Sequence, residues 1–376
     1  MWTKIVPVTA LIAAVSLTGG TASAAPTTPV GGEALGSRDL VAPAGVKQPP
    51  KSKATSYVIA DADTGQVLAA KDAHGRYLPA STLKTLTALT LISKLDKNRK
   101  IRPSRNACNQ EGSAVGLSVK ATYKIDDLFK ALMMSSGNDA AMALAEANGS
   151  LAQTMNDMNA EAKRLQANDT VAKTPSGLDK PGQSSSAYDL ALIARAGLAN
   201  ADFRRYISTK TAKFPAPKGY YEISNHNKLL WRYPGMIGVK NGWTTKAQAS
   251  FVGAATRGGH TILVSIMRHE GFFWEEVSKL LDWGFSVRGK AAPVGQLVDP
   301  LPDTALAAPQ QQPQQPAATP GTSVTPAAQP PLLDTAAAKQ TDSTKTVGSL
   351  VIGGGLLFGL VWLGYGIRRK RTRSRS

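Results

Sequence analysis

A serine and a lysine three positions apart, Ser81 and Lys84, are the first residues of the sequence that could carry covalent chemistry. Apolar residues recur at helical spacing after Pro79, so we expect both to lie in the first turn of a helix and on one face. A neutral lysine amine can act as the base that makes a serine hydroxyl a nucleophile. The unpaired N–H groups of a first turn also favour developing negative charge. Alone, the pair is more typical of a capping serine followed by a solvated lysine.

A second polar group, Ser136-Gly137-Asn138, interrupts two segments with helical spacing, 126–134 and 140–147. A hydroxyl and an amide that face one cleft can relay a proton and hold a peptide backbone. Serine and asparagine also cap helix starts, and glycine often follows a helix end. The group is therefore a candidate for the same site only in combination with other motifs.

The third group is Lys240-Asn241-Gly242-Trp243-Thr244. Its lysine supplies a fixed positive charge for an anionic substrate group, and its glycine lets a ligand approach the backbone of a strand. A second cation near Lys84 would lower the pKa of that amine and favour its basic form. A turn with a solvated lysine is the alternative interpretation of this group alone.

The elements that must position these motifs form one α/β domain, which we expect at residues 52–299. Residues 57–60 and 66–69 are β-prone runs around a turn, and 249–256 and 261–267 form a second such pair. Helical spacing lies between them, and an amphipathic helix that begins at Trp274 closes the domain. This order predicts a sheet whose first and last strands pair and which helices cover.

The two ends of the chain predict where it works. Residues 1–24 carry Lys4, an apolar stretch and a small-residue end, which is the pattern of a secretory signal peptide. A short membrane anchor is the alternative. Residues 347–367 contain no charge and are followed by the basic residues of 368–376, which predicts a transmembrane helix with a cytoplasmic tail. We therefore expect a single-pass protein of the cell membrane, with its domain outside the cytoplasm facing the cell wall.

Proline-rich sequence separates the domain from both ends. Residues 25–51 are rich in Pro, Gly and Ala, and residues 300–346 are rich in Pro and Gln. Such sequence buries too little apolar surface to offset its chain entropy, so we expect two linkers.

Composition excludes several classes of protein. The 376 residues carry 44 Lys and Arg against 26 Asp and Glu, a net charge of +18, which suits anionic surroundings. The apolar segment beside the basic tail indicates a membrane, so we expect no nucleic acid partner. The single cysteine, Cys108, and four histidines argue against disulfides and a metal site, and we expect no metal and no cofactor. His269-Glu270 begins like a metalloprotease box, but Phe273 stands where the second histidine is required.

Taken together and in this order, S-x-x-K, S-x-N and K-x-G resemble the signature of the penicillin-recognising serine peptidases and β-lactamases. The gaps of 51 residues from Lys84 to Ser136 and 101 residues from Asn138 to Lys240 are similar to those of the low-molecular-weight D-alanyl-D-alanine carboxypeptidases. The resemblance runs through about residues 57–287. Further segments that carry it are 79–87, 135–141, 175–179, 225–230 and 281–285. It implies the β-lactamase/DD-peptidase-like fold, an antiparallel sheet with helices packed around it.

The resemblance also implies a mechanism. Ser81 would attack the carbonyl between two D-alanines of a peptidoglycan stem peptide, with Lys84 as base and Ser136 as the proton donor to the leaving amine. The backbone N–H groups of Ser81 and Trp243 would bind the oxyanion. The substrate-binding residues would be Asn138, Lys240, Asn241, Gly242, Trp243 and Thr244. β-Lactam inhibitors would acylate the same serine.

Two features depart from the family pattern or extend it. Asn241 replaces the threonine that helps to bind the terminal carboxylate, so this contact should pass to the Asn241 amide or to Thr244. Arg268, on the last strand, is a candidate second partner of that carboxylate, although a solvated strand-end charge is the simpler interpretation.

Three other functions stay open from sequence. A DD-endopeptidase would share all the motifs. A β-lactamase would need a water-activating glutamate, which loop 175–179 does not offer. A degenerate, non-catalytic wall-binding protein is favoured by Asn241 alone.

Overall fold

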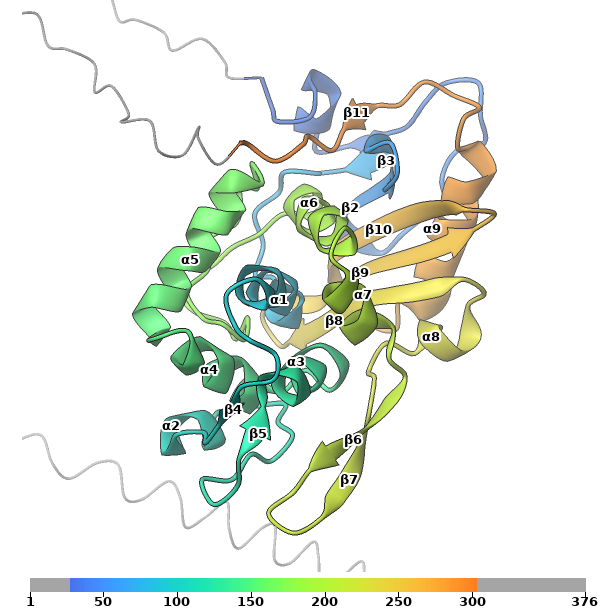
Figure 1. Cartoon of the computed structure of the whole chain (residues 1–376). Helices are drawn as coiled ribbons and strands as arrows, with labels where there is room; N and C mark the ends of the chain where they lie inside the picture. The colour runs from blue at the N-terminus through green and yellow to red at the C-terminus, as the bar shows by residue number, and fades with distance from the viewer. Residues whose placement is uncertain (1–27, 303–376) are drawn as a thin grey trace, which may run out of the picture. The chain divides into compact units, whose positions relative to one another are not determined.

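The computed structural model describes residues 28–302, and a single antiparallel sheet is its centre (Figure 1). The strands lie in the order β1-β3-β2-β10-β9-β8, and β11 also pairs with β3. Their bounds are β1 Leu40–Val41, β2 Ala54–Asp61, β3 Gln66–Lys71, β8 Met236–Thr244, β9 Gln248–Arg257, β10 His260–His269 and β11 Gly295–Gln296. The first long strand, β2, pairs with the last long strand, β10, from Asp61↔Ile262 to Ala54↔His269. The prediction that the terminal strands pair is therefore confirmed.

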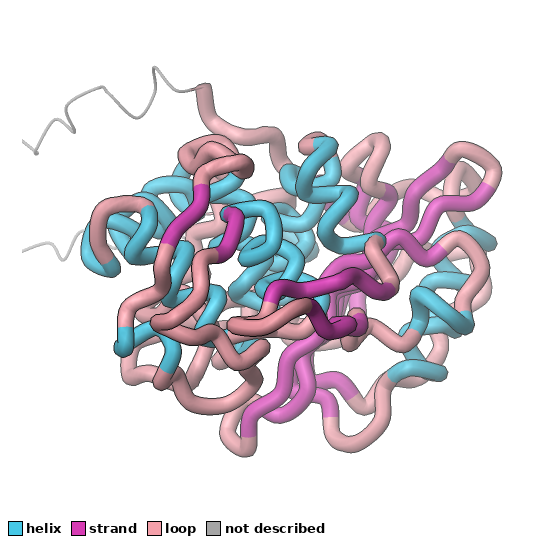
Figure 2. Tube along the Cα trace, turned by 60° about the horizontal axis from the view of Figure 1, so that its bottom comes forward, coloured by secondary structure: helices cyan, strands magenta, loops and turns pink. Residues whose placement is uncertain are grey.

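Both faces of this sheet are buried, which explains the nearly continuous apolar runs of β2 and β10. Val58 and Ala60 point into one core, and Tyr57 and Ile59 point into the other. The larger core lies under the helices α1 to α7, and α9 covers the opposite face. Figure 2 shows the same arrangement, with most helices gathered on one side of the strands.

The helices α1, α3, α4 and α9 fall close to the segments that the spacing predicted, whereas α2 and α5 to α8 were not predicted. Their bounds are α1 Lys84–Ile92, α2 Arg105–Cys108, α3 Ile125–Met134, α4 Asn138–Ala147, α5 Leu151–Arg164, α6 Ala187–Leu198, α7 Ala201–Ser208, α8 Leu229–Arg232 and α9 Trp274–Val287. Two 3₁₀ turns, η1 Glu33–Gly36 and η2 Ala80–Leu83, precede β1 and α1. There are also two small two-stranded antiparallel sheets, β4 Lys100–Ile101 with β5 Tyr123–Lys124 and β6 Thr211–Pro215 with β7 Tyr220–Ser224.

The interpretation of residues 25–51 as a linker is wrong for the part that the structure describes. The segment forms η1 and β1, and β1 adds to the edge of β3. Leu35 is buried, and the Lys47 carbonyl accepts a hydrogen bond of 2.7 Å from the Trp283 indole. A few anchoring contacts are enough to order a short segment against a sheet edge, and composition does not reveal them.

The predicted signal peptide, transmembrane helix and basic tail lie outside the described residues, as does the C-terminal linker beyond residue 302. Within residues 28–302 no helix has the length and apolar character needed to cross a bilayer.

Candidate active site

The nucleophile segment is a tight turn held against the sheet. Ser81 lies in η2, and Lys84 is the first residue of α1. Residues three apart eclipse each other in a 3₁₀ turn, so the Lys84 amine reaches the Ser81 hydroxyl at 2.9 Å. Ser250 of β9 donates a hydrogen bond of 2.6 Å to the Pro79 carbonyl and fixes the start of the turn. The predicted shared face of Ser81 and Lys84 is confirmed, on a 3₁₀ turn.

Lys84 is fully buried and has two further partners. Its amine donates to Asn138 Oδ1 at 2.7 Å and to the Ser176 carbonyl at 2.6 Å. Burial lowers the pKa of Lys84 well below its usual value, and the positive charge of Lys240 adds to this, against an opposing effect of Asp139. Carbonyl oxygens only accept hydrogen bonds, so a neutral Lys84 amine gives its two hydrogens to them. Its lone pair then faces the Ser81 hydroxyl.

The break between α3 and α4 presents the second polar group. Ser136 is buried and has a φ of 61°, a strained value for serine. No residue of the described chain hydrogen-bonds the Ser136 hydroxyl. Asn138 is also buried, and its backbone N–H and side-chain amide donate to the Ser113 and Glu111 carbonyls at 2.7 and 2.6 Å. The structure therefore brings Asn138 to Lys84, with Ser136 two residues before it at the same break between the helices.

The third group runs along β8 beside the nucleophile. A Cβ atom added to Gly242 would lie 2.5 Å from the Ser81 nitrogen, so only glycine lets the strand approach this closely. Lys240 is fully buried, donates to the Asn241 carbonyl at 2.7 Å, and has its pKa lowered to about 7 by burial. Trp243, the next residue after Gly242, is 67% exposed.

Thr244 is not available for the role that the sequence offered it. Its hydroxyl donates its one proton to Asp179 Oδ1 at 2.9 Å and accepts from the Ala247 N–H at 2.9 Å. The Asn241 side-chain amide, in contrast, is half-buried and makes no hydrogen bond within residues 28–302. Of the two candidates for the missing threonine contact, Asn241 is the one whose donor is uncommitted.

Two contributors to this site were missed by the sequence analysis. The Ser176 carbonyl reaches Lys84 because Gly177, at a φ of 83°, packs directly on the Ala80 carbonyl. The backbone N–H of His226 donates to the Met134 carbonyl at 2.8 Å, two residues before Ser136. Desolvation and the positive charges of Lys240 and Lys84 lower the pKa of His226. Ser176 and His226 lie in segments that carry the family resemblance. Only the backbone contacts seen in the structure connect them to Lys84 and to the Ser136 segment.

Arg268 lies on β10 at an irregular position of the sheet, with a φ of 52°. Its guanidinium is exposed and stands 5.6 Å from the centre of the Tyr77 ring. A contact between Arg268 and a substrate carboxylate stays a prediction.

One cluster of the described chain has metal-ligand chemistry, His74, Asp169 and Asp189, whose ligand atoms lie within 4.8 Å of one another. Both ring nitrogens of His74 already have partners, Asp169 Oδ2 at 2.8 Å and the Val30 carbonyl at 3.0 Å. Asp189 Oδ2 accepts from the Asp169 N–H at 2.8 Å. These contacts form a hydrogen-bonded network between the start of α6 and residues 28–51, which we call the N-terminal arm.

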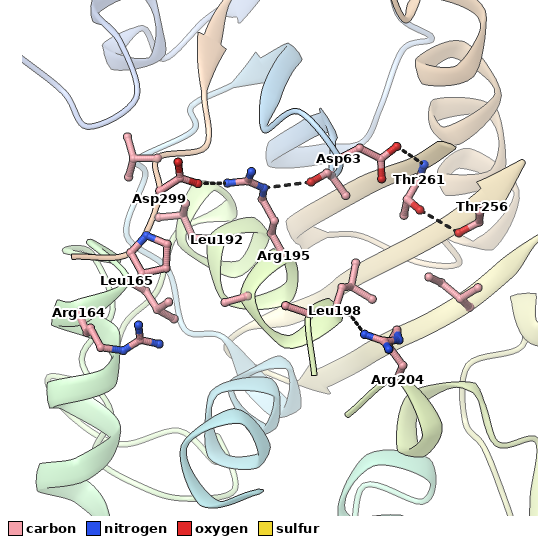
Figure 3. Close-up of a pocket in the computed structure, with 16 residues that line it drawn as sticks. Asp63, Arg164, Leu165, Leu192, Arg195, Leu198, Arg204, Thr256, Thr261 and Asp299 are labelled. Atoms are coloured by element: carbon pink, nitrogen blue, oxygen red, sulfur yellow. Dashed lines mark hydrogen bonds and ion pairs between the residues drawn. The ribbon is translucent and has the colours of Figure 1, made fainter. Parts of the chain in front are cut away.

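A cavity of about 620 Å³ lies at the other end of the sheet from Ser81 (Figure 3). It lies near the turn between β9 and β10, where Thr256 faces Thr261, whereas the catalytic end of the same strands carries Gln248 and His269. Arg195 in the cavity donates to the Ala62 carbonyl at 3.0 Å and pairs with Asp299 at 2.9 Å. The cavity therefore belongs to the packing of the C-terminal segment and contributes nothing to the catalytic group.

The fold and the site fit one class of protein, the serine hydrolases in which a lysine three residues after the serine can act as its base. The family model described as D-alanyl-D-alanine carboxypeptidase, peptidase family S11, matches residues 44–271. The chain belongs to this family of serine-type D-Ala-D-Ala carboxypeptidases.

Individual relatives agree with this assignment. The D-alanyl-D-alanine carboxypeptidase DacB2 of Mycobacterium tuberculosis is 41% identical over 264 residues, which are 68% of this chain and 90% of the relative. The D-alanyl-D-alanine carboxypeptidase DacF of Bacillus subtilis is 32% identical over 249 residues, which are 62% of each chain. The crystal structure of a D-alanyl-D-alanine carboxypeptidase from M. tuberculosis superposes with a TM-score of 0.66 at 39% identity, covering 69% of this chain and 100% of that one. The Streptomyces K15 DD-transpeptidase superposes with a TM-score of 0.61 at 27% identity, covering 64% and 100%. The family resemblance and the fold class of the described residues are thus confirmed.

Proposed function

We propose that this protein is a membrane-anchored carboxypeptidase that removes the terminal D-alanine from peptidoglycan stem pentapeptides outside the cytoplasm, through an acyl-enzyme on Ser81. The observation that carries the proposal is the contact of 2.9 Å between the fully buried Lys84 amine and the Ser81 hydroxyl. A charged lysine could not take up the serine proton, and burial, together with the nearby charge of Lys240, lowers the pKa of Lys84 and so favours its neutral form.

In the first step, Ser81 Oγ attacks the carbonyl carbon between the two D-alanines while its proton passes to Lys84. The backbone N–H groups of Ser81 and Trp243 hold the oxyanion, and loss of one such donor typically costs about 3 kcal/mol of transition-state stabilisation. The close approach of Gly242 to the Ser81 nitrogen supports this pairing of N–H groups.

In the second step, the C–N bond breaks and the proton moves from Lys84 through the Ser136 hydroxyl to the departing amine. The unbonded Ser136 hydroxyl suits a relay, because it is free to accept and donate in turn. Water then attacks the Ser81 ester while Lys84 takes up one of its protons, and Lys84 returns that proton to Ser81 Oγ as the ester C–O bond breaks. Asn138 positions the peptide, and Lys240 attracts its terminal carboxylate.

The proposal is tested by the intact mass of the full chain, in detergent, after mixing with benzylpenicillin. We expect a lasting adduct that maps to Ser81, together with release of D-alanine from a peptide that ends in D-Ala-D-Ala. A Ser81→Ala variant should form neither product. Consumption of the drug without an adduct would instead indicate a β-lactamase, and cleavage of a cross-linked dimer alone would indicate an endopeptidase.

The location of the protein is a separate part of the proposal. The apolar span at 347–367 and the basic tail that follows support a single-pass anchor with the domain facing the wall. A mature N-terminus near Ala25 and sedimentation with membranes are the expected results. A core that is found in the cytoplasmic fraction with Met1 intact would contradict it.

A further inference from the structure

A carboxylate without a cationic partner stands at the end of the catalytic strand. Asp179 accepts the hydroxyl proton of Thr244, the last residue of β8, at 2.9 Å. The residue is half-buried, and no Lys, Arg or His of residues 28–302 forms an ion pair with it. The chain has a net charge of +18, so cationic side chains are plentiful, yet none pairs with this acid. We therefore look for its cationic partner in the substrate.

The loop that carries Asp179 is fixed at several points. Gln183 accepts from the Thr174 hydroxyl at 2.9 Å and donates to the Leu178 carbonyl at 2.8 Å. The preceding Pro175 carbonyl accepts from Thr87 of α1 at 2.8 Å. The carboxylate is therefore held in place before a ligand arrives, and binding to it needs little further ordering.

The direction of the substrate follows from the site. β8 is the last strand of the sheet, so its outer edge can pair with an extended peptide. Gly242 fixes the level of the scissile carbonyl beside Ser81, and Lys240 attracts the C-terminal carboxylate at the earlier end of the strand. The upstream part of the peptide then extends toward Thr244. Thr244 lies two residues, about 7 Å, beyond Gly242 along the strand. The residue before the D-Ala-D-Ala pair lies one residue, about 3.4 Å, upstream of the scissile carbonyl, and a long side chain on it covers the remaining distance to Asp179.

We propose that Asp179, oriented by Thr244, is a specificity-determining residue that binds a free side-chain amine on the stem-peptide residue preceding D-Ala-D-Ala. The inference rests on the proposed function and narrows its substrate class to stem peptides with an unsubstituted diamino residue. Peptides whose amine is acylated, as in a cross-link, are poorer substrates, because acylation removes the charge that Asp179 binds. Lys180 and Lys246 are exposed, and their charges are screened by solvent and salt.

The test compares two peptides with the full chain in detergent: Nα-acetyl-L-Lys-D-Ala-D-Ala, whose ε-amine is free, and the Nα,Nε-diacetyl form. We expect the free amine to raise kcat/KM about fivefold, chiefly through KM, because a partly exposed ion pair contributes equally to bound substrate and transition state. The preference should shrink between 50 and 500 mM salt, since such pairs are screened.

Variants assign the preference to Asp179. Asp179→Asn keeps the acceptor for Thr244 and should abolish the preference, and Asp179→Lys should invert it. The ratio of the two kcat/KM values is the readout, because a general loss of activity cancels in it. Glu270→Gln is the matched control, since it removes an exposed acid at the same end of the sheet and should keep the wild-type ratio.

Two outcomes would overturn the inference alone: equal kcat/KM for both peptides in the wild type, or an unchanged ratio in Asp179→Asn. Hydrolysis of the diacetyl peptide in either case leaves the proposed carboxypeptidase function standing. Failure of the wild type to hydrolyse either peptide overturns the proposed function itself.

Discussion

At the scale of single residues, two buried lysines of one site, Lys84 and Lys240, differ in their proposed roles and in the protonation state that each role needs. Burial holds the pKa of Lys84 well below its usual value, which favours the neutral, basic form of this amine. The pKa of Lys240 is lowered to about 7, so its charge is lost as the pH rises through that value. Acid therefore protonates the base and alkali removes the charge that attracts the substrate carboxylate, which predicts a bell-shaped dependence of kcat/KM on pH.

A variant separates these two limbs. Arginine stays charged at all accessible pH values, so Lys240→Arg should keep the acid limb and remove the alkaline one. The measurement is kcat/KM for a D-Ala-D-Ala peptide from pH 5 to 10. An alkaline limb that persists in Lys240→Arg would show that another group titrates there.

Asn241 gives a second prediction at this scale. Its side-chain amide makes no hydrogen bond within residues 28–302, so Asn241→Thr should replace a free amide donor by a hydroxyl that can contact the terminal carboxylate. A hydrogen bond to a charged group contributes about 1.5–3 kcal/mol, and exchange of one donor for another alters only part of this. We expect acylation by benzylpenicillin to become about threefold faster. The control is the hydrolysis of a D-Ala-D-Ala peptide whose terminal carboxylate is amidated. Its rate should be the same for Asn241→Thr and the wild type, because the carboxylate contact is absent.

At the scale of elements, the periodic parts of the chain were predictable and the contacts of its loops were not. The pairing of β2 with β10 and the break between α3 and α4 follow from local patterns of apolar and polar residues. The carbonyl of Ser176 and the carboxylate of Asp179 act through contacts that are 92 and 65 residues distant in sequence. A local sequence pattern cannot indicate contacts between residues so far apart. The motifs therefore predicted Ser81, Lys84 and Lys240 but not the loop residues that contact this site.

Gly177 tests the role of this supporting loop. Alanine there would face both a left-handed φ of 83° and a collision with the Ala80 carbonyl, so Gly177→Ala should push Ser176 away from Lys84. We expect a loss of about 1–3 kcal/mol in the free energy of unfolding and a slower acylation of Ser81. Gly182→Ala is the control on the same loop, with a φ of 77° but its nearest neighbour at 3.7 Å. Equal acylation rates in the two variants would contradict the supporting role.

At the scale of the whole molecule, the domain is closed by its two ends. The N-terminal β1 and the C-terminal β11 both pair with β3, and the Gln296 N–H donates to the Gly31 carbonyl at 2.8 Å. This closure lies away from Ser81, so it should govern stability and leave catalysis alone. It also means that the folded domain begins earlier than the proline content of residues 25–51 suggested.

Leu35 measures how much this closure contributes. Its side chain is 1% exposed and packs against Gly295, whereas Leu40, on the same arm, is 43% exposed. Leu35→Ala should lower the free energy of unfolding by about 2–4 kcal/mol through lost burial and the cavity left behind, and lower Tm by about 5–10 °C. Leu40→Ala should change Tm by about 1–2 °C, because little apolar surface is lost. Both variants should acylate with benzylpenicillin at the wild-type rate at 25 °C. If Leu35→Ala left Tm unchanged, the N-terminal arm would be a tether after all, and the proline-rich composition would have been the better guide to residues 28–51.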